Sequence, residues 1–235
     1  MHIYCINLEK REDRRRDATA EFSRENLDVE FFPATDGRID TPKGLYVSPA
    51  EYGCSMSHTR VWRDIVDKGY EKAIIFEDDV RLIPNFRSKL HEVMEDAQGL
   101  EWDIIHLGPL LPISKNRYVD GLALYEGKSL GSHAYIITLE CARKISVFDP
   151  KLLQVPIDFQ VCRFPLKMLC VGKVLAKQET IDDSSIVGLV KSTFNGDIGL
   201  ERTFDLNYLI RFCIKKFRIL IAIFAALCVW FFTRM

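Results

Sequence analysis

The chain has 235 residues, of which 48% are hydrophobic, 28% charged and 11% aromatic, so it can bury a core and falls outside the disordered, collagenous and repeat classes. Its 32 basic and 33 acidic residues give a net charge of -1, which removes the electrostatic reason to expect a nucleic-acid partner. The length predicts one large domain with an appendage.

The N-terminus and the cysteines both argue against export. The chain becomes charged at Glu9, so it lacks the basic start and long apolar run of a signal peptide. Its seven cysteines are an odd number without Cys-x-x-Cys pairs, which fits neither a disulfide framework nor a structural zinc site. We expect reduced thiols and a cytoplasmic protein.

The chain opens with a β-prone segment, residues 2–6, which predicts a buried strand leading into a helix over residues 11–26. Arg14, Arg15 and Arg16 lie near the start of that helix, where the helix dipole disfavours cations. They form either a solvated face or a positive site for a nucleotide diphosphate at the strand-to-helix turn.

The next segments alternate between strand and helix patterns. Residues 29–32 predict a strand that ends before the Asp36-Gly37 turn. Ser48-Pro49-Ala50-Glu51 combines a capping box with an N-terminal proline and predicts a helix that runs to Gly69. His58 lies on the apolar face of this helix, which is more typical of a core histidine than of a ligand.

Residues 72–76 form an unbroken apolar run followed by Glu77-Asp78-Asp79. Such a run predicts a strand buried on both faces. Ligands of open α/β sheets bind outside the carboxyl ends of the strands, and clustered carboxylates there suit Mg²⁺ or Mn²⁺ bridging a diphosphate. An acidic turn exposed to water is the alternative.

The rest of the domain continues the alternation. The expected elements are a helix after Pro84 that stops at Gly99, a strand over 102–108, a long loop over 109–131, a strand over 133–137, a helix over 139–147 and a short helical piece that opens with residues 156–158. Strand and helix alternate over residues 1–175, which predicts an α/β fold with a mostly parallel, doubly wound sheet.

The C-terminal segment is basic and apolar. Residues 202–235 contain six Lys or Arg and one Asp, and the uninterrupted apolar run covers only 219–232. As a helix this run spans about 21 Å, short of the roughly 30 Å hydrocarbon core. We expect a helix lying on an anionic membrane surface, with docking on protein as the alternative.

Several short motifs occur in a characteristic order: Ile6-Asn7-Leu8 with Arg14-Arg15, Phe32-Pro33-Ala34-Thr35-Asp36-Gly37, Glu51-Tyr52-Gly53-Cys54-Ser55-Met56-Ser57-His58, Phe76-Glu77-Asp78-Asp79-Val80, Trp102-Asp103-Ile104-Ile105, Gly131-Ser132-His133-Ala134-Tyr135 and Pro156-Ile157-Asp158. Together they resemble glycosyltransferase family 25, which includes lipooligosaccharide β-galactosyltransferases and collagen galactosyltransferases. The resemblance covers roughly residues 2–187 and excludes the tail.

The resemblance implies a GT-A-like nucleotide-sugar-binding fold that uses Mn²⁺ or Mg²⁺ and transfers a sugar from a UDP-sugar with inversion. Galactose is the sugar expected of the family, and the tail favours a lipid-linked glycan such as lipooligosaccharide or lipopolysaccharide as acceptor. We therefore expect a catalytic domain over 1–203 and a membrane-associating helical tail over 204–235. The enzyme would be peripheral on the inner face of a membrane.

The resemblance also assigns residues to roles. Asp79 is the expected main metal ligand, with Glu77 and His133 as further ligands, although His133 could simply pack beside Tyr135. The expected nucleotide-sugar pocket comprises Asn7, Arg14, Asp36, His58, Glu77 and Asp78. Asp158 is the expected general base and Asp103 its alternate. The acidic motif reads Glu-Asp-Asp and so departs from Asp-x-Asp.

Other functions fit parts of the pattern. A hydrolase that uses two carboxylates would also need paired acids at a pocket, and product analysis would distinguish it. A membrane-tethered module could bind a nucleotide sugar without turnover. An aspartyl-phosphate phosphatase is disfavoured, because Asn7-Leu8-Glu9 stands where its Asp-x-Asp motif would follow the first strand.

Overall fold

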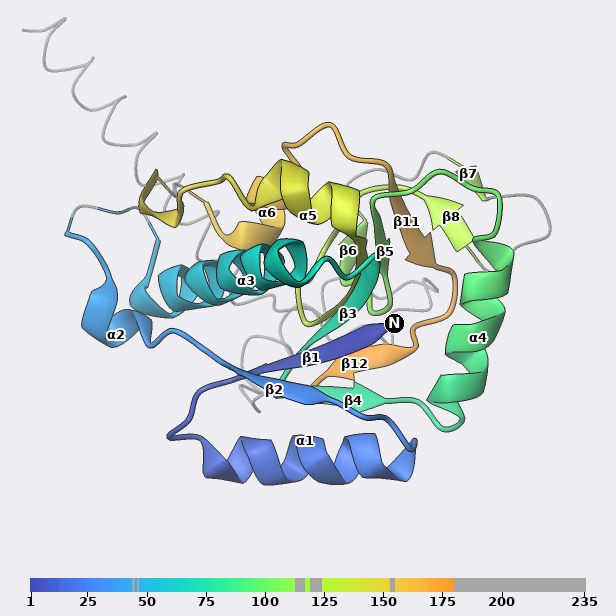
Figure 1. Cartoon of the computed structure of the whole chain (residues 1–235), viewed down its shortest axis with the longest axis horizontal. Helices are drawn as coiled ribbons and strands as arrows, with labels where there is room; N and C mark the ends of the chain where they lie inside the picture. The colour runs from blue at the N-terminus through green and yellow to red at the C-terminus, as the bar shows by residue number, and fades with distance from the viewer. Residues whose placement is uncertain (44, 46, 113–116, 119–123, 153–154, 180–235) are drawn as a thin grey trace, which may run out of the picture. The chain divides into compact units, whose positions relative to one another are not determined.

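The computed structural model describes residues 1–43, 45, 47–112, 117–118, 124–152 and 155–179 (Figure 1). Residues 1–179 belong to one compact unit. The predicted tail, 204–235, and residues 180–203 lie outside the described part of the chain. Within the described part, no helix combines the length and the apolar character needed to cross a membrane.

A central sheet of eight strands has the order β2-β1-β3-β10-β5-β11-β8-β7. Its strands are β1 (His2–Asn7), β2 (Glu30–Pro33), β3 (Lys72–Glu77), β5 (Ile104–His106), β7 (Arg117–Tyr118), β8 (Leu124–Glu126), β10 (Ala134–Thr138) and β11 (Met168–Val171). Only β10 and β8 run against the others, so six of these eight described strands share one direction. The predicted α/β fold with a mostly parallel sheet is confirmed.

The segment 109–131, predicted to be a loop, contains short strands instead. It contributes β7 and β8 to the sheet, and β6 (Leu111–Pro112) pairs with β9 (Ser129–Leu130). Because β10 follows β9 directly without a crossover helix, it can enter the sheet antiparallel, between β3 and β5. A second small sheet, also not predicted, pairs β4 (Val80–Leu82) with β12 (Ala176–Gln178).

Helices cover both faces of the sheet (Figure 1). The helices of one face are α1 (Glu12–Arg24) and α4 (Phe86–Asp96), and those of the other are α3 (Pro49–Lys68), α5 (Leu139–Ile145) and α6 (Ile157–Val161). The short helices are α2 (Gly37–Asp40) and the 3-10 helix η1 (Pro150–Leu152). Adjacent β1 residues Cys5 and Tyr4 are both fully buried in opposite cores, as expected of a strand covered on both faces.

The helix α3 begins and ends where the sequence predicts. The Ser48 hydroxyl accepts a hydrogen bond from the backbone N–H of Glu51, and the Glu51 carboxylate accepts one from the N–H of Ser48. The chain leaves the helix at Gly69, whose φ of 69° lies in the left-handed region. This capping fixes the first turns of α3, which carry Cys54 and His58 toward the end of β3.

Two glycines allow the turn after β2 to lie against the start of α3. A Cβ on Gly37 would lie 1.7 Å from the carbonyl oxygen of Pro49, and one on Gly53 would lie 2.6 Å from that of Thr35. Both atoms belong to the backbone, so a side chain at either position would separate these segments. The close approach holds the loop after β2 beside the helix that bears His58.

Candidate active site

The carboxyl ends of β1 and β3 bring most of the predicted polar residues to one edge of the sheet. Asn7 is the last residue of β1, and Glu77 is the last residue of β3. Since the two strands are parallel and adjacent, their ends meet, and Asp78 and Asp79 follow at once. A hydrogen bond between Asn7 and Asp78 joins the end of β1 to the acidic motif.

Asp78 is held by two side chains of the predicted nucleotide pocket. Its Oδ2 accepts a hydrogen bond from Asn7 Nδ2 at 2.8 Å, and its Oδ1 accepts one from Arg14 Nη1 at 2.9 Å. Arg14 Nη1 also lies 3.4 Å from Asp79 Oδ2. These carboxylates offset the unfavourable position of Arg14 near the start of α1. Both oxygens of Asp78 are therefore engaged.

Asp79 has an oxygen without a partner. Its side chain is buried, and Oδ1 has no hydrogen bond within the described residues. Its Oδ2 accepts a hydrogen bond from Gln178 Nε2 at 3.3 Å. Burial, followed by repulsion from Glu77, raises the pKa of Asp79 to about 7, although Arg14 opposes the shift. A buried carboxylate with a free oxygen and unbalanced negative charge fits a divalent cation.

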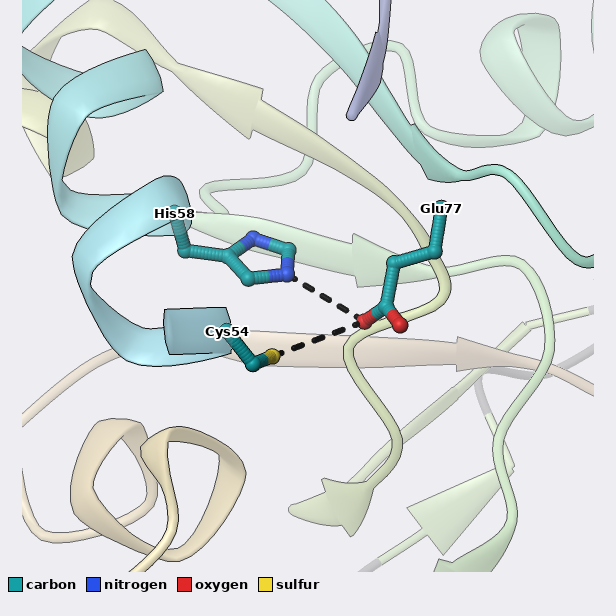
Figure 2. Close-up of side chains that lie close together, drawn as sticks. All are labelled: Cys54, His58 and Glu77. Atoms are coloured by element: carbon teal, nitrogen blue, oxygen red, sulfur yellow. Dashed lines mark hydrogen bonds and ion pairs between the residues drawn. The ribbon is translucent and has the colours of Figure 1, made fainter. Parts of the chain in front are cut away.

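Glu77 is held by donors on two other segments. Its Oε1 accepts a hydrogen bond from Ser132 Oγ at 2.6 Å and one from His58 Nε2 at 3.2 Å. Figure 2 shows the bond to His58. Burial favours a higher pKa for Glu77, but the hydrogen bonds from His58 and Ser132 lower it to about 2. Glu77 is therefore ionised at neutral pH.

Cys54, His58 and Glu77 place one potential metal-ligand atom each within 4.8 Å of one another (Figure 2). Cys54 Sγ lies 4.0 Å from Glu77 Oε1. Burial and the charge of Glu77 raise the pKa of the Cys54 thiol well above its ordinary value, and His58 is already hydrogen-bonded to Glu77. As it stands, the cluster is a hydrogen-bonded network around Glu77 rather than a set of free ligands.

His133 is not brought into a ligand cluster with Asp79 and Glu77 in the described part of the chain. It is buried, and its Nε2 lies 3.2 Å from the carbonyl oxygen of Ala176, which it faces as a donor. Its backbone carbonyl accepts a hydrogen bond from the N–H of Glu77 at 2.9 Å. This arrangement supports the alternative of a packed histidine, and we leave His133 out of the proposed cation site.

Asp158, the expected base, lies close to the acidic edge despite its distance along the chain. It lines a cavity of about 20 Å³ together with His58, Ser132 and Gly131. Its Oδ1 accepts a hydrogen bond from the N–H of Phe159 at 2.8 Å, and Oδ2 accepts one from the N–H of Gly131 at 3.4 Å. Burial raises its pKa to about 6 against these hydrogen bonds.

Asp103, the expected alternate base, is not brought to the acidic motif and lies at the other end of the sheet. Its carbonyl oxygen accepts a hydrogen bond from the N–H of Thr138, which pairs with Lys72 at the start of β3, whereas Glu77 ends that strand. Its carboxylate accepts hydrogen bonds from Lys144 Nζ at 3.0 Å and from the N–H of Lys167 at 2.8 Å. Asp103 thus ties β5 to α5 and to the start of β11.

We expect Asp103→Asn to lower the free energy of unfolding by about 1–3 kcal/mol, because a buried, charge-assisted pair of hydrogen bonds is weakened. Sugar transfer per folded molecule should not change. Chemical denaturation followed by an activity assay on the folded fraction tests both statements. If Asp103→Asn lost sugar transfer while its free energy of unfolding stayed unchanged, Asp103 would have a catalytic role.

Asp36 caps a short helix beside the acidic edge. Its Oδ1 accepts a hydrogen bond from the backbone N–H of Arg38 at 3.2 Å at the start of α2, and its Oδ2 pairs with Lys10. Both oxygens therefore serve local structure. A contact between Asp36 and a nucleotide stays a prediction.

The sequence profile of glycosyltransferase family 25, described as an LPS biosynthesis protein, matches residues 1–117. The chain belongs to glycosyltransferase family 25. The match includes β1, α1, α3 and the acidic motif at the end of β3, which are the segments that meet at the site.

Family 25 relatives match a longer part of the chain. A glycosyltransferase 25 family member of Aedes aegypti is 34% identical over 179 residues, which are 67% of this chain and 30% of the relative. Inactive glycosyltransferase 25 family member 3 of Homo sapiens is 31% identical over 179 residues, 66% of this chain and 30% of that protein. Procollagen galactosyltransferase 2 of Mus musculus is 29% identical over 180 residues, 66% of this chain and 29% of that protein.

The chain therefore spans about a third of the length of the curated family 25 relatives it matches. Among solved structures, A197 from STIV resembles it with a TM-score of 0.47 at 12% identity, over 77% of this chain and 87% of that one.

Three residues of this family 25 site were not singled out as functional from the sequence. Ser132 and Tyr135 lie inside the Gly131–Tyr135 motif, but neither residue type by itself indicates a bond to a distant acid or histidine. Gln178, which bonds Asp79, follows a segment without a motif. Its position depends on the pairing of β12 with β4, for which the sequence carries no local signal.

Proposed function

We propose that this chain is an inverting, metal-dependent glycosyltransferase domain that moves a sugar from a UDP-sugar to a glycan acceptor. The observation that carries the proposal is the unpartnered, buried Oδ1 of Asp79 at the carboxyl end of β3. Membership of family 25 supports sugar transfer as the reaction class. The unpartnered oxygen supports a bound cation, because it lies at the carboxyl end of a strand, where ligands bind in open α/β sheets.

Asp79 and Glu77 would hold the cation, since carboxylate oxygens are the ligands that Mn²⁺ and Mg²⁺ prefer. When bound, such a cation offsets the negative charge that grows on the departing UDP. Arg14, whose side chain is 27% exposed, adds a positive charge beside the same carboxylates. Asn7 and Arg14 hold Asp78 in place and thereby fix the turn that carries Asp79.

Asp158 is proposed as the general base. Its pKa, raised to about 6, leaves it ionised at neutral pH yet basic enough to accept a proton. The acceptor hydroxyl oxygen would attack the anomeric carbon, the bond from that carbon to UDP would break on the opposite side, and the hydroxyl proton would pass to Asp158. This sequence of bond changes inverts the anomeric centre.

Galactose from UDP-galactose is the proposed donor sugar, supported by the name of the murine relative, procollagen galactosyltransferase 2. A lipid-linked glycan such as lipooligosaccharide is the proposed acceptor. The description of the family as an LPS biosynthesis protein supports it, as do the six basic residues and the apolar run of the C-terminal segment. The proposed location is the cytoplasmic face of a membrane.

The decisive experiment incubates the purified chain and Mn²⁺ with a panel of UDP-sugars and measures UDP release with and without glycan acceptors. Acceptor-dependent release with a glycosylated product supports the proposal. Release that yields free sugar at an equal rate without acceptor would indicate a hydrolase instead.

A second candidate is a module that binds a nucleotide sugar without turnover. It is favoured by the human relative, 31% identical, whose name describes it as inactive. Calorimetric binding of a UDP-sugar, with no product from any acceptor, would support this candidate.

We expect removal of residues 204–235 to release the protein from vesicles that contain anionic lipid, because this segment combines basic and apolar residues. Transfer to a soluble acceptor should persist, since the proposed site lies within residues 1–179. Vesicle co-sedimentation of both chain lengths at low and high salt provides the measurement. A full-length chain that never binds, or a shortened one that stays bound in high salt, would contradict the membrane role.

A further inference from the structure

A chain of buried hydrogen bonds leads from the core to Glu77. Trp62 Nε1 donates to the Tyr135 hydroxyl at 2.8 Å, and that hydroxyl lies 2.9 Å from His58 Nδ1. His58 Nε2 lies 3.2 Å from Glu77 Oε1. Trp62, Tyr135 and His58 are at most 4% exposed. These groups are therefore shielded from bulk solvent.

The donors in this chain decide which ring nitrogen of His58 carries the proton. An indole N–H can only donate, so the Tyr135 oxygen accepts from Trp62 and offers its single proton to His58 Nδ1. His58 Nδ1 is then an acceptor, and Nε2–H donates to Glu77. A proton on Nδ1 would leave the buried Tyr135 hydroxyl proton without an acceptor among the described residues.

The donors to Glu77 meet the same oxygen. Ser132 and His58 each bond Oε1, Cys54 Sγ lies 4.0 Å from it, and no described residue donates to Oε2. Figure 2 shows the contacts of His58 and Cys54 with Oε1. Two donors from different elements, the segment before β10 and the helix α3, restrict rotation of the carboxylate. Its second oxygen is left for a ligand.

We propose that Tyr135 and Trp62 are positioning residues that hold His58 in its Nε2–H tautomer, so that Glu77 presents Oε2 to the cation or the nucleotide. The inference rests on the proposed function for the identity of that ligand, but the tautomer follows from the hydrogen-bond chain alone. It gives the buried Trp62 and Tyr135 a role beyond packing.

The tautomer is tested directly by ¹⁵N–¹H correlation spectra of the histidine rings in the full chain, with His58 assigned through a His58→Gln variant. We expect a single Nε2–H form in the wild type and a mixture of tautomers in Tyr135→Phe. Tyr4→Phe is the matched control, because Tyr4 is also buried and also bonds a residue of α3, Asp64. A wild-type His58 that carries its proton on Nδ1, or on both nitrogens, would overturn the proposal.

The consequence for Glu77 is tested by calorimetric binding of UDP in the presence of Mn²⁺. Loss of a hydrogen-bond partner of a metal ligand typically costs about 10- to 100-fold in metal affinity or activity, and Tyr135→Phe, which acts on Glu77 through His58, should weaken binding by about 10-fold, the lower end of this range. The KM for the acceptor should not change, nor should any binding constant of Tyr4→Phe. Ser132→Ala removes the other donor to Oε1 without altering the core, and should weaken UDP binding in the same direction.

These readouts separate the two proposals. If the wild type transfers no sugar, the proposed function fails, whereas the ring spectra and UDP binding still decide the role of Tyr135. If Tyr135→Phe and Ser132→Ala both bind UDP and Mn²⁺ as tightly as the wild type, the positioning role is wrong.

Discussion

Replacement of Asp79 by alanine should reduce sugar transfer in saturating Mn²⁺ by at least about 10³-fold, because the substitution removes the proposed main ligand of a cation worth several kcal/mol in the transition state. Asp79 Oδ1 has no hydrogen-bond partner among the described residues, so no protein contact competes for it. Initial rates of UDP release and calorimetric titration with Mn²⁺ would measure both effects.

The same variant should remain folded. A carboxyl group whose pKa is raised to about 7 in the folded state stabilises the fold at low pH, and this stabilisation is lost as the pH rises through about 7. At pH 8 the ionised Asp79 therefore opposes folding, and Asp79→Ala should melt at the same temperature or higher. Asp103→Asn, at the other end of the sheet, is the control for loss of a buried acid. An Asp79 variant that keeps most of its activity would exclude Asp79 as a principal ligand.

Asp158→Asn should lower kcat by about 10²- to 10⁴-fold while leaving UDP-sugar binding nearly unchanged, because the amide keeps the shape of the side chain but cannot accept the hydroxyl proton. The hydrogen bond from the N–H of Phe159 can be kept by the amide oxygen. In the wild type, kcat should fall as the pH decreases through about 6, where Asp158 becomes protonated. Steady-state measurements of kcat between pH 5 and pH 8 would show this decrease.

The alternative for Asp158 is a structural role at the start of α6. Since burial raises its pKa, the ionised group opposes folding at neutral pH, and the asparagine variant should not be less stable there. A lower melting temperature with kcat preserved would assign Asp158 to the structure of α6 and its contact with Gly131. Asp103, the expected alternate base, lies at the amino end of β5, away from Asp158.

The local elements were predictable where the signal was local. β3 follows from an unbroken apolar run, and α3 from a capping box at one end and Gly69 at the other. The strands in segment 109–131 were not predictable, because they are only two or three residues long and too short to show a hydrophobic period. The antiparallel direction of β10 also had no local signal, since direction depends on the connection that precedes a strand.

The sequence by itself determined the two buried strands β1 and β3 and the polar residues at their carboxyl ends. In each case the apolar run and the polar residues after it are consecutive in the chain, so the pattern is local. Only the tertiary structure decided what each acid does. Asp78 bonds Asn7, 71 residues away, and Arg14, 64 residues away, whereas His58 meets Tyr135 across 77 residues. Asp79 Oδ1 is the fully buried oxygen of this motif that has no hydrogen-bond partner among the described residues. Hydrophobic periodicity specifies which face of an element is buried, but the partner of a polar side chain depends on which elements pack together.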